Sequence, residues 1–340
     1  MKMKVLVTGG AGYIGSTICT ALIEAGHTPV ILDSLIKGRE EFIADRIFYK
    51  GDINNSTLVE KIFKEHDDIE CVIHCAALIV VSESVEHPYE YYRENVQKTI
   101  NFFKKISELG CRKIIFSSSA SIYGESNLLE VDENTNIDGK SPYARTKQIV
   151  EMIMKDYCNA YKIKGIALRY FNPIGADPML RTGSYLEKPE NVLGKIIEAA
   201  KDDNSVFYIT GTNWNTRDGS GLRDYIHVWD LANGHVKAIE NMDYAFEMEG
   251  MDYGFIPINI GRGDGVTVRE LVSQVENVLG RHIRKEEAEA REGDIAGACA
   301  KVDKALRLIK WKAELSVEDG IRDALRWESE RKNKLAIGEN

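Results

Sequence analysis

Thr8-Gly9-Gly10-Ala11-Gly12-Tyr13-Ile14-Gly15 is the stretch that decides the fold. It follows an apolar segment, residues 4–8, that is typical of a buried strand, and helical spacing begins within it and continues to residue 25. Glycine permits a tight turn, close approach of the backbone to a ligand, and close packing of a helix against a strand. The N–H groups at the start of the helix attract an anion. The stretch therefore predicts a turn that binds the pyrophosphate of a dinucleotide, through Gly9, Gly12, Tyr13, Ile14 and Gly15.

An acidic residue supports the same prediction. Asp33 stands at the end of the second predicted strand, residues 28–32. Its carboxylate can accept hydrogen bonds from a ribose diol and would repel a 2′-phosphate, so NAD is favoured over NADP. Lys37 and Arg39 lie nearby and weaken this preference. We predict cofactor contacts from Asp33 and from Ser34, which follows it.

The first half of the chain alternates short apolar runs with longer helical patterns. We expect further strands at residues 47–49, 71–76, 113–117 and 165–169, and helices at residues 55–65, 89–109 and 143–161. Strands separated by helices imply crossover connections, and hence a parallel sheet that is covered on both faces. The predicted fold is doubly wound α/β.

The second half is less regular and predicts a smaller, mixed α/β domain. We expect a polar loop at residues 213–221, a strand at 257–260 that returns to the first sheet, and helices at residues 227–240, 267–279 and 317–329. The final residues, 331–340, are polar and are expected to fray. The chain is therefore divided into a cofactor domain, residues 1–171 with 227–260 returning to it, and a substrate domain formed mainly by residues 172–340.

Composition narrows the class of protein. The 340 residues are 44% apolar and 29% charged, as in a soluble globular protein, and the net charge of −9 argues against broad nucleic-acid binding. The apolar run near the start is too short for a signal segment, and no stretch is long enough to span a membrane. We expect a cytoplasmic protein with no nucleic-acid or membrane partner.

Six cysteines are scattered along the chain without a CxxC pair. A metal site built from Cys71, His74 and Cys75 is conceivable, but alternation along a strand would point His74 away from its neighbours. We predict ordinary core thiols and no metal site.

A tyrosine and a lysine stand four residues apart in Tyr143-Ala144-Arg145-Thr146-Lys147, which places them on one face of a helix. Upstream, Ser117-Ser118-Ser119 ends a strand, where side chains emerge beside the cofactor crevice. Free tyrosine has a pKa of about 10, so it is a poor base at neutral pH. A nearby ammonium and a positive nicotinamide ring both favour the phenolate and lower its pKa. The pattern predicts a catalytic tyrosine with a lysine partner and a serine that holds the reacting oxygen.

Further blocks run through nearly the whole chain, at residues 8–16, 51–53, 72–74, 83–85, 116–124, 141–147, 168–175, 218–231 and 291–294. In the order and spacing of these blocks the chain resembles the extended short-chain dehydrogenase/reductase family and, within it, the UDP-galactose 4-epimerases. The resemblance implies a Rossmann sheet, bound NAD, and inversion at C4 of a UDP-hexose through a 4-keto sugar. Tyr143 would take the proton of the C4 hydroxyl while hydride passes from C4 to NAD.

For the cofactor, the resemblance implies that Asp52-Ile53 contacts the adenine and that Ala76-Ala77 lines the path of the pyrophosphate and nicotinamide ribose. Asn95 would support the cofactor side, and Tyr170 would pack near the nicotinamide. The chain departs from the family at Ile79, where a member carries a lysine that would reach the cofactor phosphates. This departure leaves the tightness of NAD binding open.

For catalysis, the resemblance implies Ser119 as the serine that orients the substrate, Tyr143 as the base, and Lys147 as its partner. Tyr143 and Lys147 are also the pair that the tyrosine–lysine pattern favours, whereas the choice of Ser119 among the three serines rests on the resemblance.

A UDP group needs cations and amide donors. Arg223 and Arg291 are the leading diphosphate ligands, because guanidinium forks match phosphate oxygens. Asn172 and Asn191 can donate amide hydrogen bonds to phosphate or sugar, and Asp294 can accept one from the uridine ribose. The family blocks favour these roles for the two arginines over that of solvated surface charges.

The room beside the sugar should decide which hexose is accepted. In the family, a tyrosine shortly after the 291–294 block goes with simple hexoses, and a small residue there goes with N-acetylhexosamines as well. Alignment places Ala298 at this position. We therefore expect interconversion of UDP-glucose and UDP-galactose, and also of UDP-GlcNAc and UDP-GalNAc.

Other functions stay open. A nucleotide-sugar 4,6-dehydratase typically needs Asp-Glu just after the fifth strand, where this chain has Ser119-Ala120-Ser121. A 4-epimerase of UDP-glucuronate or of a UDP-pentose is harder to separate from the first reading. A non-catalytic NAD-sensing protein would usually lack the tyrosine or the lysine.

The family often pairs through two long helices beside the cofactor domain, here residues 89–109 and 143–161. Several apolar side chains could serve that contact or the core: Phe102, Phe103, Ile149, Met152 and Ile153. We expect a homodimer.

Overall fold

The glycine turn follows β1 (Lys4–Thr8), near the middle of a large parallel sheet. A computed structural model describes residues 2–124, 129–186, 188–189, 191–290 and 296–335. Within these residues the sheet has seven strands, in the order β11 (Gly254–Ile260), β7 (Lys164–Tyr170), β5 (Lys113–Ser117), β4 (Ile69–His74), β1, β2 (Thr28–Asp33) and β3 (Ile47–Lys50). Every neighbouring pair is parallel. The doubly wound prediction is confirmed.

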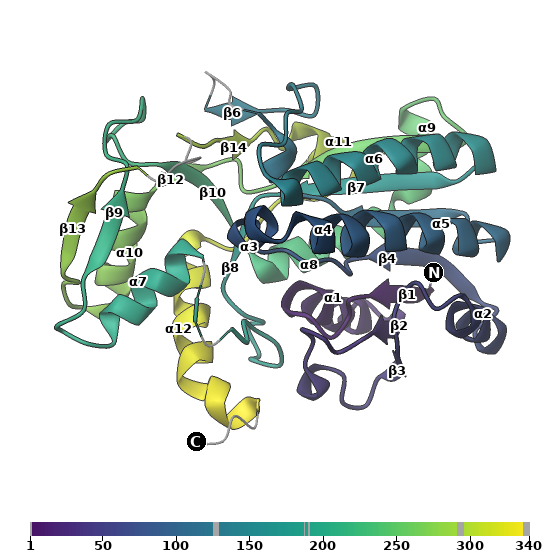
Figure 1. Ribbon diagram of the computed structural model, residues 1–340, viewed down its shortest axis with the longest axis horizontal. Helices are drawn as coiled ribbons and strands as arrows, with labels where there is room; N and C mark the ends of the chain where they lie inside the picture. The colour runs from purple at the N-terminus through teal and green to yellow at the C-terminus, as the bar shows by residue number, and fades with distance from the viewer. Residues whose placement is uncertain (1, 125–128, 187, 190, 291–295, 336–340) are drawn as a thin grey trace.

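The strands are buried on both faces, as a parallel sheet requires. Val5 and Val7 of β1 point into one hydrophobic core, while Leu6 between them points into the other. The first core is covered by α1 (Tyr13–Glu24), α8 (Val228–Glu240), α9 (Met242–Met248) and α11 (Asp303–Ile309). The second is covered by α2 (Ser56–Glu65), α5 (Lys98–Glu108) and α6 (Pro142–Tyr161). Figure 1 shows α5 and α6 in front of the sheet, with α1 and α8 on its other side.

The long helix expected at residues 89–109 is interrupted. It consists of α4 (Pro88–Tyr92), a π turn (Arg93–Gln97) and α5. Phe102 and Phe103 on α5 are fully buried in the core of the large sheet. They therefore cannot take part in a contact between subunits, because no surface of either side chain is exposed.

A smaller lobe lies on the left of Figure 1. It holds the three-stranded sheet β12 (Gly265–Thr267), β10 (Leu222–His227) and β8 (Asn172–Ile174), and the pair β9 (Phe207–Thr210) and β13 (Lys285–Ala288). Three helices pack there around an apolar core: α7 (Val192–Ala200), α10 (Val268–Leu279) and α12 (Val317–Lys334). Most of these strands have too few residues to show a periodic pattern in the sequence.

The chain returns to the large sheet twice after residue 172. β11 extends the sheet beside β7, as expected for residues 257–260, and α8 packs against α1. The second return, residues 303–311, was not expected. There α11 enters the core of the large sheet, and the Trp311 indole donates to the carbonyl oxygen of Asp230 at 3.1 Å.

The expectation that residues 331–340 fray is wrong for the part that the structure describes. α12 continues to Lys334, and Arg331 is buried, where it donates to the carbonyl oxygen of Leu186. Residues 336–340 lie outside the described residues. No helix in the described ranges is long and apolar enough to cross a membrane.

Candidate active site

The glycine turn is pressed against the loop that follows β4. Gly9 has a φ of +71°, and a Cβ atom on it would lie 2.8 Å from the backbone nitrogen of Ala76. A Cβ atom on Gly15 would lie 2.1 Å from the carbonyl oxygen of Gly9. The α1 helix begins at Tyr13 without a side-chain cap, so the N–H groups of its first turn face the space that these glycines keep open. This backbone cradle fits a dinucleotide pyrophosphate.

Asp33 closes the other side of the turn. Its carboxylate accepts hydrogen bonds from the backbone N–H groups of Ala11 (3.0 Å) and Leu35 (2.8 Å). Burial raises the pKa of Asp33, and the two backbone hydrogen bonds oppose that shift. Ser34 is half-buried beside it. Because each carboxylate oxygen has two lone pairs, Asp33 can still accept from a ribose diol.

Asp52 and Ile53 follow β3. The Asp52 carboxylate accepts from the Lys98 ammonium (2.5 Å) and from the backbone N–H of Asn54 (2.8 Å), while Ile53 is buried in the core. These contacts hold the turn between β3 and α2 at the edge where an adenine would lie.

Asn95 acts on the loop after β4, which contains the half-buried Ala76-Ala77. Its Oδ1 accepts from the N–H of Leu78 (2.8 Å), and its Nδ2 donates to the carbonyl oxygen of Leu78 (2.9 Å) and to the hydroxyl of Thr146 (3.1 Å). Asn95 lies in the π turn, a distortion common at functional sites. It ties the loop to α6. Ile79 in the same loop is 56% exposed.

Tyr143, Lys147 and Ser119 are brought together at the carboxyl end of β5. The Ser141 hydroxyl caps α6 by accepting from the N–H of Ala144 (3.1 Å), so Tyr143 lies in the first turn of the helix. The Lys147 ammonium lies 5.9 Å from the centroid of the Tyr143 ring. Ser119 lies close enough to the Tyr143 phenol to lower its pKa. The phenol and the ammonium are both almost fully buried.

Burial controls the charge of both groups. It raises the pKa of Tyr143 to about 12, and the nearby Ser119 offsets only part of that shift. Burial also lowers the pKa of Lys147 to about 8. Among the protein's own groups, burial disfavours the phenolate more than its neighbours favour it. The expected lowering of this pKa by the ammonium together with a nicotinamide ring stays a prediction.

Tyr170 ends β7 and is 9% exposed. Burial raises the pKa of Tyr170, and the nearby Tyr143 and Cys75 add to that shift. The predicted contact of Tyr170 with the nicotinamide stays a prediction.

Among the residues that it describes, the structure does not bring those predicted to bind UDP together at one place. Arg223 on β10 donates from Nη1 to the carbonyl oxygens of Leu222 (2.8 Å) and Ala296 (3.1 Å), so it anchors the segment before Ala298. Ala298 is half-buried. Asn172 begins β8 and is exposed. Arg291 and Asp294 lie outside the described residues.

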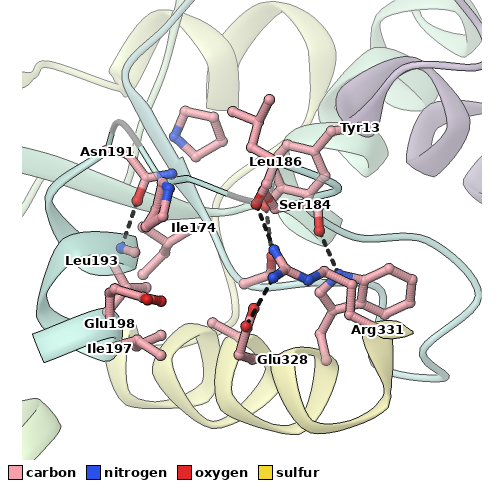
Figure 2. Close-up of a pocket in the computed structure, with 16 residues that line it drawn as sticks. Tyr13, Ile174, Ser184, Leu186, Asn191, Leu193, Ile197, Glu198, Glu328 and Arg331 are labelled. Atoms are coloured by element: carbon pink, nitrogen blue, oxygen red, sulfur yellow. Dashed lines mark hydrogen bonds and ion pairs between the residues drawn. The ribbon is translucent and has the colours of Figure 1, made fainter. Parts of the chain in front are cut away.

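Asn191 and Tyr13 line a cavity between the large sheet and the smaller lobe (Figure 2). The Oδ1 of Asn191 caps α7 by accepting from the N–H of Gly194 (2.7 Å), so Nδ2 is the group that could serve a ligand. The Tyr13 hydroxyl donates to the carbonyl oxygen of Gly175 (2.6 Å). Tyr143, Lys147 and Arg223 are not among the residues that line this cavity. The side chain of Tyr13 thus points away from the glycine cradle, and only its backbone can serve the cofactor.

Comparison with known proteins agrees with this geometry. The family described as NAD dependent epimerase/dehydratase matches residues 5–253. The chain is 38% identical to the UDP-glucose 4-epimerase of Yersinia enterocolitica over 97% of its own length and 99% of the relative's. The chain belongs to this family.

Solved structures give the same assignment. A UDP-glucose 4-epimerase from Stenotrophomonas maltophila, with bound NAD and formylated UDP-arabinopyranose, is 33% identical, has a TM-score of 0.91, and aligns over 97% of this chain and 99% of that one. A UDP-N-acetylglucosamine 4-epimerase from Methanobrevibacter ruminantium is 30% identical, has a TM-score of 0.83, and aligns over 97% and 100%. Within the epimerase/dehydratase family, the chain is therefore an NAD-dependent isomerase of the UDP-glucose 4-epimerase type.

Two parts of this epimerase site were not predicted from sequence. His235 on α8 donates from Nδ1 to the carbonyl oxygen of Leu231 (2.9 Å), so its Nε2 accepts from the Ser117 hydroxyl (2.9 Å). Burial lowers the pKa of His235 to about 4. Glu151 contacts the hydroxyl of Ser118 (2.5 Å). A search for residues four apart after Lys147 would have found Glu151, whereas nothing in the sequence connects His235 to the serines.

The sulfur and imidazole groups considered for a metal belong to other contacts. The His74 ring lies between the hydroxyls of Thr8 (2.8 Å) and Thr99 (3.0 Å), and the Cys71 thiol points to the carbonyl oxygen of Val72. The described residues contain no group of three or more potential metal ligands.

Proposed function

We propose that this enzyme inverts C4 of the hexose in UDP-glucose and UDP-galactose, and in UDP-GlcNAc and UDP-GalNAc, through a 4-keto sugar. One observation carries the proposal. The Tyr143 phenol lies beside Ser119, with its ring centroid 5.9 Å from the Lys147 ammonium, at the same edge of the sheet as the glycine cradle. This edge is where a dinucleotide crosses a doubly wound sheet.

The cradle of Gly9 and Gly15, the first turn of α1 and Asp33 would hold NAD, with Asp52, Ile53, Ala76, Ala77, Asn95 and Tyr170 around it. When bound, NAD supplies a positive nicotinamide ring that favours the phenolate, and it accepts and returns the hydride of C4. The Tyr143 phenolate takes the proton from the C4 hydroxyl and later returns it to that oxygen. Ser119 donates a hydrogen bond to the same oxygen, and Lys147 supplies a positive charge beside the phenolate.

Inversion requires an uneven division of binding. The UDP group must be held firmly, for which we propose Asn172, Asn191, Arg223, Arg291 and Asp294. The hexose must be held weakly enough for its keto form to turn over between the two transfers. Uniformly strong contacts to the sugar would stabilise one orientation and slow the reaction.

The position of Ala298 supports acceptance of N-acetylhexosamines. Leu222 donates its N–H to the carbonyl oxygen of Ala296 (2.8 Å), and a Cβ atom on Gly297 would lie 1.8 Å from the carbonyl oxygen of Leu222. The segment is thus pressed against β10 and cannot retreat from the sugar. The size of the side chain at position 298 then sets the room for an acetamido group, and alanine leaves the most room short of glycine.

We also propose a cytoplasmic homodimer. Exposed apolar side chains gather on α3 (Val81–Glu86), α4 and α6, namely Val81, Val85, Tyr89 and Met152. Tyr89 is 69% and Met152 is 62% exposed, which is unusual for large apolar side chains on one side of a monomer. The six free cysteines are consistent with a reducing compartment.

The test is a panel of UDP-sugars incubated with the purified enzyme without added NAD. We expect UDP-glucose, UDP-galactose and their N-acetyl forms to interconvert, because NAD is retained. Conversion of only UDP-glucuronate or a UDP-pentose would overturn the choice of sugar. Loss of water from the sugar would indicate a dehydratase, and no conversion even with NAD added would favour a non-catalytic NAD-sensing protein.

A further inference from the structure

Glu151 lies on the same face of α6 as the proposed catalytic pair. It follows Lys147 by four residues and Tyr143 by eight, so the three side chains line one stripe of the helix. It is 4% exposed, and its Oε1 accepts a hydrogen bond from the Ser118 hydroxyl at 2.5 Å. Glu151 therefore joins α6 directly to the serines that follow β5.

The same carboxylate is held by Arg169 on β7. Arg169 donates from Nε to Oε1 (3.0 Å) and from Nη2 to Oε2 (2.6 Å) of Glu151. The side chain of Arg169 is 3% exposed and that of Glu151 is 5% exposed. Burial disfavours the charge on Arg169, but the hydrogen bonds and charge of Glu151 more than compensate, and they raise the pKa of the guanidinium. The carboxylate has contacts on both oxygens, as a buried charge requires.

The network extends beyond this pair. Arg169 also donates from Nη1 to the Tyr123 hydroxyl (3.1 Å), and Tyr123 donates to the Oδ1 of Asn259 on β11 (2.5 Å). The contacts thus fix α6 against β5, β7 and β11. A translation or rotation of α6 would break several buried hydrogen bonds at once.

We propose that Glu151 and Arg169 are a positioning pair that holds Tyr143 and Lys147 in register with Ser117 and Ser119. The proposal rests on the proposed role of Tyr143 as the base. Buried ion pairs contribute little net stability compared with well-packed apolar side chains, so stability alone is a weak reason for this pair. Precise placement is a stronger reason, because a shift of about 1 Å in a reacting group can lower the rate about 100-fold.

Glu151 also contributes a charge to the site. The titratable groups around the lysine are His74 and Cys75 from β4 and its loop, Tyr143 and Glu151 from α6, Tyr170 from β7, and His235 from α8 through Ser117. Burial raises the pKa of the Cys75 thiol to about 11, so the thiol is neutral at pH 7. Glu151 favours the ammonium of Lys147 and opposes the larger effect of burial.

The test compares three variants of the holoenzyme with UDP-glucose as substrate. Glu151→Gln keeps the shape and the Ser118 contact but removes the charge. We expect kcat to fall about 10- to 100-fold with KM changed less than about threefold, and the alkaline limb of the kcat–pH profile to move to lower pH as Lys147 loses its proton earlier. The double variant Glu151→Met/Arg169→Met should unfold at the same thermal midpoint as the parent enzyme, but its kcat should stay below that of the parent. Asp323→Ala, which removes the buried contact to His227, should lower the midpoint and leave kcat unchanged.

Recovery of kcat in the double variant, or an unchanged alkaline limb in Glu151→Gln, would overturn the proposal. A spectroscopic measurement tests the positioning role independently of the proposed epimerase reaction. The ultraviolet absorbance of the Tyr143 phenolate is obtained by subtracting the Tyr143→Phe spectrum from that of each holoenzyme. Glu151→Gln should shift the pKa of this phenol even if no UDP-sugar is converted, because the charge and the placement of α6 around it change, and an unchanged pKa would count against the positioning role.

Discussion

The Lys147 ammonium donates its hydrogen bond to the carbonyl oxygen of Ser117, at 2.8 Å, and not to the Tyr143 phenol. The lysine is thereby fixed to the end of β5, and it also lies 4.8 Å from the centroid of the Phe116 ring. Its charge lies 5.9 Å from the centroid of the Tyr143 ring. This arrangement keeps the ammonium in place whether the phenol is protonated or not, which suits the proton transfers proposed for Tyr143.

Tyr143→Phe removes the proposed base and keeps the ring. We expect kcat for UDP-glucose to fall roughly 10²- to 10⁴-fold, the usual contribution of a positioned acid–base group. UDP should bind with unchanged affinity, because the ring remains in place. The measurement is steady-state turnover together with calorimetric titration of UDP. Turnover close to that of the parent would remove Tyr143 from the mechanism.

Gly15→Ala introduces a Cβ atom that would meet the carbonyl oxygen of Gly9 at 2.1 Å. The overlap is with backbone, so the turn must move, and a loss of stability of at least about 1–3 kcal/mol is expected. Purified variant protein should carry less NAD, measured by absorbance of the cofactor released on denaturation. Gly234→Ala on α8 is the matched control, because its Cβ atom would meet its nearest neighbour at an ordinary 3.4 Å. Equal NAD content in the two variants would contradict the cradle.

Ala298→Tyr should narrow the choice of substrate. The bulkier side chain fills the room proposed for the acetamido group, so kcat/KM for UDP-GlcNAc should fall by at least roughly tenfold. The value for UDP-glucose should stay within about threefold of the parent. The informative quantity is the ratio of the two, measured on one preparation. If this ratio does not change, the side chain at position 298 does not determine which hexose is accepted.

His235 should make stability fall in mild acid. Its pKa is about 4 in the folded state against about 6.5 in the unfolded state. Only the unfolded chain binds the proton between these values, so the stability is fully present above about pH 6.5 and is lost as pH falls toward 4. His235→Gln should flatten the dependence of the free energy of unfolding on pH by about 1.4 kcal/mol per pH unit in this window. Urea unfolding at pH 7 and pH 5 measures the difference, and parallel curves for the two proteins would contradict it.

The proposed homodimer can be tested at Met152. Met152→Glu places a charge on the exposed apolar face of α6 and should shift the sedimentation coefficient from dimer to monomer. Met248→Glu on α9 is the control, because Met248 is also exposed, at 46%, but lies on a helix that covers the other face of the sheet. A parent protein that sediments as a monomer, or a Met152→Glu dimer, would reject this interface.

Local pattern was sufficient for the large sheet and the cofactor turn. The glycine spacing favours a backbone cradle, because side chains at Gly9 and Gly15 would overlap main-chain atoms of the adjoining loop and of the turn itself. The spacing of Tyr143 and Lys147 likewise follows from helix geometry alone. Both features depend on residues close together in sequence, or on strands that are adjacent in the sheet.

The sequence by itself thus determined the doubly wound sheet, the cradle and the shared face of Tyr143 and Lys147, because periodicity and glycine stereochemistry act over a few residues. Only the tertiary structure decided what surrounds them. It anchored Lys147 to Ser117, joined Glu151 to Arg169, brought His235 from α8 to the serines, and buried Phe102 and Phe103 in the core. It also buried the Tyr143 phenol, which raises its pKa. These features depend on burial and on contacts between elements that are distant in sequence, and local sequence patterns specify neither of them.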